Sequence, residues 1–252
     1  MIYVRNLTKQ YPGGITAVNS ISFEINKGEI CGYIGTNGAG KSTTVKILIG
    51  ALDFDSGDVK INGIDVKKEP VEVKKVIGYV PESANLFNSL TVSEFLSFTG
   101  TVHNLDEGTL NRRIDSFAEI FEFTQHLKDS IGNLSKGNKQ KTLITSALLH
   151  NPSVLFLDEP LNGLDANAIF TFQDLVLELA RKGKTIFYCS HLLDTIERIS
   201  SKIILIDKGQ IVLDKKTEEL KASKDYTNLE NLFKSLKDEA QIKRFSYEDI
   251  YG

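Results

Sequence analysis

The sequence predicts an α/β fold with a mostly parallel central sheet, a β-rich N-terminal part and an inserted helical segment. Short apolar strands alternate with helical patterns along much of the chain. A glycine-rich turn at Gly35–Thr43 stands between one such strand and a helix, and residues 87–150 are nearly all helical in pattern. Strands that alternate with helices form a mostly parallel sheet with crossover helices, which gives the fold class.

The composition is that of an ordinary globular protein. The 252 residues are 41% hydrophobic and 25% charged, which allows a large core in one extended domain or in two. The net charge of -3 gives no sign of the basic face that a duplex-binding protein carries, so we expect no nucleic-acid partner. Cys31 and Cys189 stand far apart in apolar stretches without metal-ligand spacing, and we expect buried thiols.

The chain has no pattern for membrane insertion. Its N-terminus lacks the apolar core of a signal peptide. No run approaches the roughly 18 to 20 apolar residues that span a bilayer. We therefore expect a soluble, cytoplasmic chain that reaches a membrane only through a partner.

The N-terminal third alternates strand and turn patterns. Apolar runs between the turns Pro12–Gly14 and Asn26–Gly28 predict a β-rich start. Helical spacing of Val45, Leu48 and Ile49 predicts a helix directly after the glycine-rich turn. The elements expected after residue 28 are a strand at Glu29–Ile34, a helix at Thr43–Leu52, a strand and turn at Asp58–Ile64 and a strand at Val76–Val80.

The rest of the chain begins with the helical insertion. Thr91 and Glu94 form a capping box ahead of an apolar helix. A later helix is expected to bury one face, made of Ile114, Phe117, Ile120 and Phe121. The remaining elements expected are strands at Val154–Asp158, Thr185–Cys189 and Ile203–Asp207, and helices at Ala166–Lys182 and Leu192–Ile199. We assign residues 1–216 to one domain and residues 217–252 to a charged helical tail.

The turn GTNGAGKST matches the phosphate-loop pattern GxxxxGK[ST] in full. Its glycines let the backbone bend tightly and turn N–H groups towards phosphate oxygens, and the next helix adds its positive end. Lys41 is expected to reach the β- and γ-phosphates of ATP, and the Ser42 hydroxyl to ligate Mg²⁺. The alternative is a glycine-rich turn that contains GKS by chance. The predicted ATP-binding loop comprises Gly35, Thr36, Asn37, Gly38, Ala39, Gly40, Lys41, Ser42 and Thr43.

A buried strand, VLFLDEP at Val154–Pro160, ends in two carboxylates. Asp158 is placed to hold Mg²⁺, directly or through water. Glu159 could orient and deprotonate the attacking water. The alternative is a strand that meets solvent with an acidic turn, but the upstream phosphate loop favours the catalytic interpretation.

Three further signals are weak when taken alone. Ser135 and Gly137, in LSKGN, stand at the start of a helix and could bind an anion, although a plain serine cap is more common. His191 follows a strand at the edge where ligands bind in open α/β sheets, although a lone histidine is more often structural. Tyr11 could stack on a base or be simply half-buried.

Together, and in this order, these motifs resemble the ATP-binding cassette (ABC) ATPases, from Tyr11 to at least Asp207. The resemblance implies a P-loop NTPase fold with an N-terminal antiparallel β subdomain. It also implies that Tyr11 stacks on adenine and that His191 is the switch histidine. LSKGN aligns with the family's signature loop, so Ser135 and Gly137 would contact the γ-phosphate that a second subunit holds. Asn162–Asp165 matches the D-loop, which crosses the same interface.

Three positions depart from the family pattern. Glu82 stands where the family has a glutamine that ligates Mg²⁺ and senses the membrane subunit, and a carboxylate can keep the metal role. Lys136 replaces the first glycine of the signature loop, and Asn138 replaces its glutamine. Lys136 with Glu82 resembles the subgroup that drives exporters of drugs, antibiotics, lipids or sodium, and LENLF near Leu229 resembles that subgroup's C-terminal end.

The resemblance implies an ATP hydrolase that drives a transporter. Its expected partners are ATP with Mg²⁺, a second ATPase subunit in a homo- or heterodimer, and an integral membrane subunit at the inner face of the cell membrane. A first rival is an ABC ATPase without a transport role, although those often carry paired cassettes or long coiled coils that this sequence lacks. A second rival is a low-turnover regulatory subunit. Asn138 and Glu82 favour it, and the intact Lys41, Asp158, Glu159 and His191 oppose it.

Overall fold

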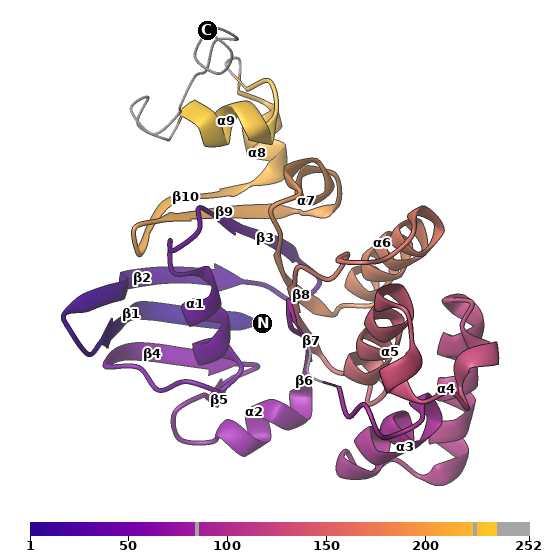
Figure 1. The fold of residues 1–252 in the computed structure, drawn as a ribbon. Coiled ribbons are helices and arrows are strands. Elements are labelled where there is room, and N and C mark those ends of the chain that lie inside the picture. Colours follow the sequence, from indigo (N-terminus) through magenta and orange to yellow (C-terminus); the bar gives the residue numbers. More distant parts are fainter. Residues whose placement is uncertain (84–85, 224–225, 236–252) are drawn as a thin grey trace, which may run out of the picture.

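The computed structural model, which describes residues 1–83, 86–223 and 226–235, is built around a six-stranded sheet of order β10-β9-β3-β8-β7-β6 (Figure 1). Every neighbouring pair in it is parallel except β9 with β10. The predicted mostly parallel sheet is thus confirmed. Its strands are β3 (Ile30–Gly35), β6 (Ile77–Val80), β7 (Val154–Asp158), β8 (Thr185–Cys189), β9 (Lys202–Asp207) and β10 (Gln210–Lys216).

The N-terminal part forms a second, antiparallel sheet of order β2-β1-β4-β5. Helix α1 (Lys41–Leu48) packs against strands of both sheets, with Val45, Ile47 and Leu48 buried between them. The expected antiparallel β subdomain is therefore present. Its strands are β1 (Ile2–Tyr11), β2 (Ile15–Ile25), β4 (Ser56–Ile61) and β5 (Ile64–Asp65).

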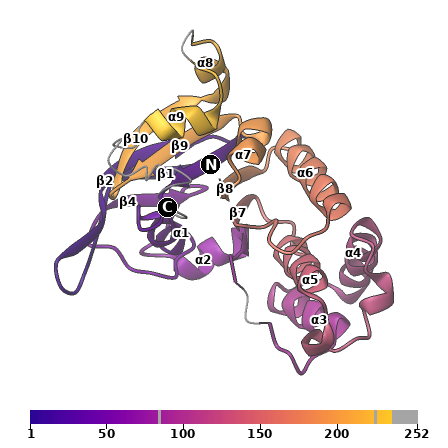
Figure 2. The same cartoon turned by 45° about the horizontal axis from the view of Figure 1, so that its top comes forward.

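The helical insertion lies to one side of the central sheet (Figures 1 and 2). Thr91 caps its first helix in the predicted capping box with Glu94. The predicted buried face is wrong at Ile120, which is 45% exposed. At 3.6 residues per turn Ile120 points about 120° away from Ile114, whereas Phe121 returns to the buried side. The insertion comprises α3 (Val92–Val102), α4 (Glu107–Ile120), α5 (Lys136–Leu148) and two 3₁₀ turns, Thr124–His126 and Ile131–Asn133.

The other helices join the strands or follow the last of them. They are α2 (Pro70–Val76), α6 (Ala166–Arg181), α7 (Leu193–Ile199), α8 (Thr217–Lys221) and α9 (Leu229–Ser235). Leu220 and Leu229, from the predicted tail, are buried in the core, and residues 236–252 of that tail lie outside the described residues. Among the described residues, every helix is too short or too polar to cross a membrane.

The central sheet separates two hydrophobic cores, and alternate side chains of each strand enter them. In β7, Leu155 and Leu157 face the core shared with the helical insertion, whereas Val154 and Phe156 face the core shared with the antiparallel sheet. Because side chains alternate at every residue of a strand, a strand buried on both faces is apolar throughout. Cys31 and Cys189 are buried free thiols, as expected.

Candidate nucleotide-binding site

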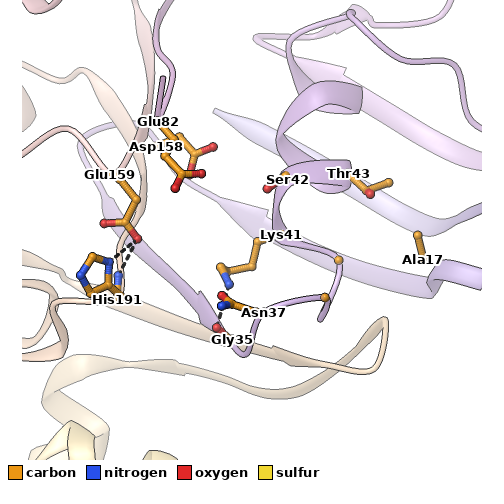
Figure 3. A pocket seen from close by; sticks show the side chains of 12 residues that line it. Ala17, Gly35, Asn37, Lys41, Ser42, Thr43, Glu82, Asp158, Glu159 and His191 are labelled. Atoms are coloured by element: carbon orange, nitrogen blue, oxygen red, sulfur yellow. Dashed lines mark hydrogen bonds and ion pairs between the residues drawn. The ribbon is translucent and has the colours of Figure 1, made fainter. Parts of the chain in front are cut away.

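The phosphate loop and the ends of three central strands line a cavity of about 740 Å³ (Figure 3). Strand β8 pairs in parallel with β3 on one side and with β7 on the other. The carboxyl ends of the three strands therefore reach the same edge of the sheet, where ligands bind in open α/β folds. The lining residues are Ala17, Gly35, Asn37, Gly38, Gly40, Lys41, Ser42, Thr43, Glu82, Asp158, Glu159 and His191.

The backbone of the phosphate loop lies directly against two strands. Gly40 has φ 110° and ψ 2°, and a Cβ atom there would lie 2.4 Å from the carbonyl oxygen of Ala17 in β2. A Cβ atom at Gly35 would lie 2.3 Å from the carbonyl oxygen of Ile206 in β9. Contacts this short leave no room for a side chain, so glycine is required at both positions for the loop to follow this path.

The Lys41 side chain folds back over its own loop. Its Nζ atom donates hydrogen bonds to the carbonyl oxygens of Gly35 at 2.8 Å and Thr36 at 3.0 Å. Ser42 and Thr43 follow in the first turn of α1 and line the same cavity. A positive charge, a helix N-terminus and two hydroxyls therefore meet at one end of the cavity, an arrangement suited to a polyphosphate.

Acidic side chains stand opposite the phosphate loop. Asp158 ends β7, and Figure 3 places Glu82 beside it. Burial raises the pKa of Asp158 to about 6, the negative charges of Glu82 and Glu159 add to this rise, and Lys41 opposes it. Crowded carboxylates of this kind favour either a bound proton or a bound cation.

Glu159 is tied to the residues that follow β8. Its backbone has φ 49°, and its amide donates to the carbonyl oxygen of Cys189 at 2.9 Å. Its Oε1 atom accepts from the His191 amide at 2.8 Å and lies 2.9 Å from His191 Nδ1. Its Oε2 atom accepts from the Ser190 hydroxyl at 2.8 Å. The geometry thus brings the predicted base and the predicted switch histidine into direct contact.

Five predicted residues are not part of this cavity's lining: Tyr11, Thr36 and Ala39, described here, and Ser135 and Gly137, described below. The Tyr11 hydroxyl lies 3.3 Å from the Thr43 hydroxyl, Tyr11 is 37% exposed, and Lys9 Nζ lies 5.8 Å from the centroid of its ring. The Thr36 hydroxyl donates to Asp207 at 3.3 Å, away from the cavity, and Ala39 is buried. Tyr11 thus stands beside the phosphate loop and is partly exposed, whereas Thr36 contacts the end of β9 through Asp207 and Ala39 is buried.

The signature loop lies apart from the cavity. Ser135 caps α5 by accepting from the Asn138 amide at 3.2 Å, so the predicted serine cap is present. A Cβ atom at Gly137 would lie 2.8 Å from the carbonyl oxygen of Gly163, in the D-loop. Within the described residues, neither Ser135 nor Gly137 lines the cavity of the same chain.

Ser190 was not predicted from the sequence. It stands directly before His191, at the end of the strand that pairs with β7 in the register Asp158 to Cys189. A polar residue at the carboxyl end of a strand beside the one bearing Glu159 could have been the signal. Its contact with Glu159 joins residues that lie 31 positions apart, which local patterns cannot reveal.

Comparisons with known proteins agree on one family. The family model described as ABC transporter matches residues 18–162. The linearmycin resistance ATP-binding protein LnrL of Bacillus subtilis is 36% identical over 84% of this chain and 68% of its own length. The ABC transporter ATP-binding protein NatA of Bacillus subtilis is 31% identical over 88% of this chain and 90% of its own length.

Solved structures give the same answer. An ATP-binding subunit of an ABC transporter is 29% identical, with a TM-score of 0.88 over 93% of this chain and 98% of its own. A bacterial ABC transporter cassette, described as dimeric, is 25% identical, with a TM-score of 0.79 over 86% of this chain and 99% of its own. The chain therefore belongs to the ABC transporter family and is an ATP-binding subunit with ATP hydrolase activity.

Proposed function

We propose that the cavity at the phosphate loop binds ATP with Mg²⁺ and that its hydrolysis drives export through a separate membrane subunit. The observation that carries the proposal is the convergence of Lys41, Asp158, Glu159 and His191 on one cavity. The loop amides and Lys41 would stabilise negative charge on the phosphates in the transition state. For this, Lys41 would exchange its carbonyl partners for phosphate oxygens, which are better acceptors for an ammonium group.

The residues present fit a magnesium ion. Ser42, Asp158 and Glu82 offer hard oxygen donors around the same cavity, and Mg²⁺ usually takes one or two carboxylates together with phosphate oxygens. Burial raises the pKa of Asp158 to about 6, and the neighbouring carboxylates Glu82 and Glu159 add to this rise. A divalent cation would offset this crowding and bring charge stabilisation to the phosphates. Glu82 can serve in place of the family's glutamine because its carboxylate lies beside Asp158.

Glu159 is our choice for the base that activates water. It is the first residue after the strand that bears Asp158. It lines the cavity, and its side chain is 13% exposed. His191 contacts both the cavity and Glu159, so it can respond to the γ-phosphate and hold the base at the same time.

The composite site would need a second subunit. Ser135 and Gly137 lie outside this chain's own cavity, which accords with a contact to nucleotide held by a partner. The dimeric relative described above supports this arrangement. Tyr11 would stack on the base, near Thr43.

An exposed apolar group supports a membrane partner. Phe87, Phe98 and Val102, on α3 and the segment before it, are 57%, 55% and 61% exposed, and Phe87 meets Phe98 edge to face with ring centroids 6.3 Å apart. Apolar side chains gathered in this way are typical of an interaction site. This group follows Glu82 in the chain, so a membrane subunit seated there could signal to the ATP site. The relative named for linearmycin resistance favours export over import.

Two experiments test the proposal. Steady-state phosphate release should require Lys41 and Glu159, so Lys41→Ala and Glu159→Gln should each lose most of the rate. A Glu159→Gln chain as fast as the wild type would contradict the assigned base, and a very slow wild type would favour a regulatory subunit. Pull-down of the full chain from detergent-solubilised membranes should recover a protein with several membrane spans. Its failure would favour a role outside transport.

A further inference from the structure

We propose that Ser190 is a positioning residue that sets the direction of the Glu159 carboxylate for ATP hydrolysis. The proposal rests on the function proposed above, in which Glu159 is the base. Ser190 follows β8 directly and is 3% exposed. Its hydroxyl lies 2.8 Å from Glu159 Oε2, and this contact is the observation from which the role follows.

The direction of this hydrogen bond is fixed by its surroundings. The Leu192 amide donates to Ser190 Oγ at 3.1 Å, so the hydroxyl oxygen already has a donor. The carboxylate can only accept, and the hydroxyl has one hydrogen to give. Ser190 therefore donates to Oε2. Because the serine is buried, water is not available to replace it on that side.

The two oxygens of Glu159 are held by partners of different rigidity. Oε1 faces His191, whose side chain is 71% exposed, while Oε2 faces the buried hydroxyl of Ser190. The terminal torsion of a glutamate side chain has a broad, roughly two-fold preference, so the chain itself does not set the plane of the carboxylate. The Ser190 hydroxyl on Oε2 and the His191 backbone amide on Oε1 therefore fix that plane together, and Ser190 supplies the only side-chain donor that the described residues place on Oε2.

Such a contact should matter for the rate of hydrolysis more than for ATP binding. Ser190 does not line the cavity that holds Lys41, although it lines a neighbouring pocket with Gly35 and Asn37. Its side-chain hydroxyl is engaged by Glu159 and by the Leu192 amide. A hydrogen bond to a charged group is worth about 10- to 100-fold in an equilibrium or a rate. Loss of the hydroxyl should lower kcat by about that factor, because small errors in the position of a base are costly.

The test uses the purified full chain. Ser190→Ala should lower kcat about 10- to 100-fold, with the Kd for ATP unchanged within about twofold. Ser190→Thr, which keeps the hydroxyl, should recover most of the rate. The matched control is Ser146→Ala in α5, which also removes a buried hydroxyl, one that donates to the Leu143 carbonyl oxygen at 2.7 Å. This control should keep the wild-type kcat.

A double variant separates positioning from a general structural effect. In a Glu159→Gln background, Ser190→Ala should cause no further loss in a single-turnover assay, since the base it orients is gone. An equal loss in both backgrounds would overturn the proposal, and so would a wild-type kcat for Ser190→Ala. If Glu159→Gln itself turned over at the wild-type rate, the assigned base would fail instead, and the two failures are thereby distinguished.

Discussion

Acidification should destabilise the nucleotide-free protein through His150, at the end of the helical insertion. His150 Nε2 donates to the carbonyl oxygen of Ile77 at 2.8 Å. Its ring stacks on His103, with centroids 3.7 Å apart and planes 9° apart. Because Nε2 carries the hydrogen, Nδ1 is bare in the neutral ring, and it is buried without a hydrogen-bond partner among the described residues. Protonation would place an N–H there with no acceptor.

The magnitude follows from linkage between protonation and folding. The pKa of His150 is lowered to about 4, mainly by burial and next by the charge of a protonated His103. Arg113 and Lys184 contribute to this lowering, and the hydrogen bond to Ile77 opposes it. In the unfolded chain the histidine pKa is about 6.5. As the pH falls from 6.5 towards 4, the unfolded state takes up a proton that the folded state does not, so the free energy of unfolding decreases. Between about pH 7.5 and pH 5 this amounts to about 1 to 2 kcal/mol after an allowance for partial exposure.

Urea unfolding at a series of pH values measures this effect. His150→Gln keeps an amide that can donate to Ile77 but cannot titrate in this range. On acidification its free energy of unfolding should therefore fall by about 1 to 2 kcal/mol less than that of the wild type. The difference between the two proteins isolates His150 from the carboxylates that titrate in the same range. If both lose stability in parallel between pH 7.5 and pH 5, the inferred burial of a neutral imidazole is wrong.

Two further predictions use matched pairs. Gly40→Ala should abolish ATP binding and cost more stability than Gly14→Ala, because both have positive φ but only Gly40 would place its Cβ 2.4 Å from the Ala17 carbonyl oxygen. Gly14→Ala should lower the free energy of unfolding in urea by about 1 to 2 kcal/mol and leave the affinity for nucleotide intact. If the two variants lost the same stability and the same nucleotide affinity, the steric argument would be refuted. Asp165→Ala and Asp106→Ala each remove an N-cap hydrogen bond, at 2.9 Å and 2.8 Å. Asp106→Ala should cost about 1 kcal/mol. Asp165→Ala should cost more, because it also takes the carboxylate away from the nearly buried Lys141. Only Asp165→Ala should also weaken ATP-dependent dimerisation, as measured by light scattering, and a loss with Asp106→Ala would argue against that distinction.

The central strands could be predicted because each is buried on both faces. Thr185–Cys189 and Val154–Asp158 appear in the structure with the bounds that their apolar runs indicate. The phosphate loop could be predicted from its residue pattern, in which glycine stands at fixed positions between a strand and a helix. The contacts that require glycine at Gly35 and Gly40 are made with Ile206 and Ala17, which lie far away in the sequence.

Other features depend on contacts that the sequence does not display. Helix α2 was not predicted, because its seven residues include only one buried side chain, Val73. Ser190 was missed because its partner is Glu159, which reaches it only when β7 and β8 pair. Both depend on tertiary packing, which overrides local propensity. The error at Ile120 is different, because the helical period itself turns this residue away from Ile114.

Helix α5, which carries the signature loop at its start, contacts the segment that runs from Glu159 through the D-loop. Gln140 Nε2 donates to the carbonyl oxygen of Pro160 at 2.8 Å, directly after Glu159. Lys141, nearly buried, lies 3.4 Å from the Asp165 carboxylate. Both contacts tie α5 to the segment that follows β7. These contacts join the first turns of α5, which follow Ser135, to the residues directly after Glu159.

The departures Lys136 and Asn138 lie on this unit and differ in consequence. A Cβ atom at Gly163 would lie 2.7 Å from Lys136 Cγ, so the lysine stem packs against the D-loop of its own chain. Asn138 joins the serine cap only through its backbone amide, a contact that any residue other than proline could make. Asparagine in place of glutamine at position 138 therefore leaves the capping hydrogen bond of α5 intact. It changes only the side chain that this position offers for contacts. In the composite site proposed above, a weakened signature would slow hydrolysis at a partner's phosphate loop, whereas hydrolysis at Lys41 and Glu159 of this chain would depend on the partner's signature.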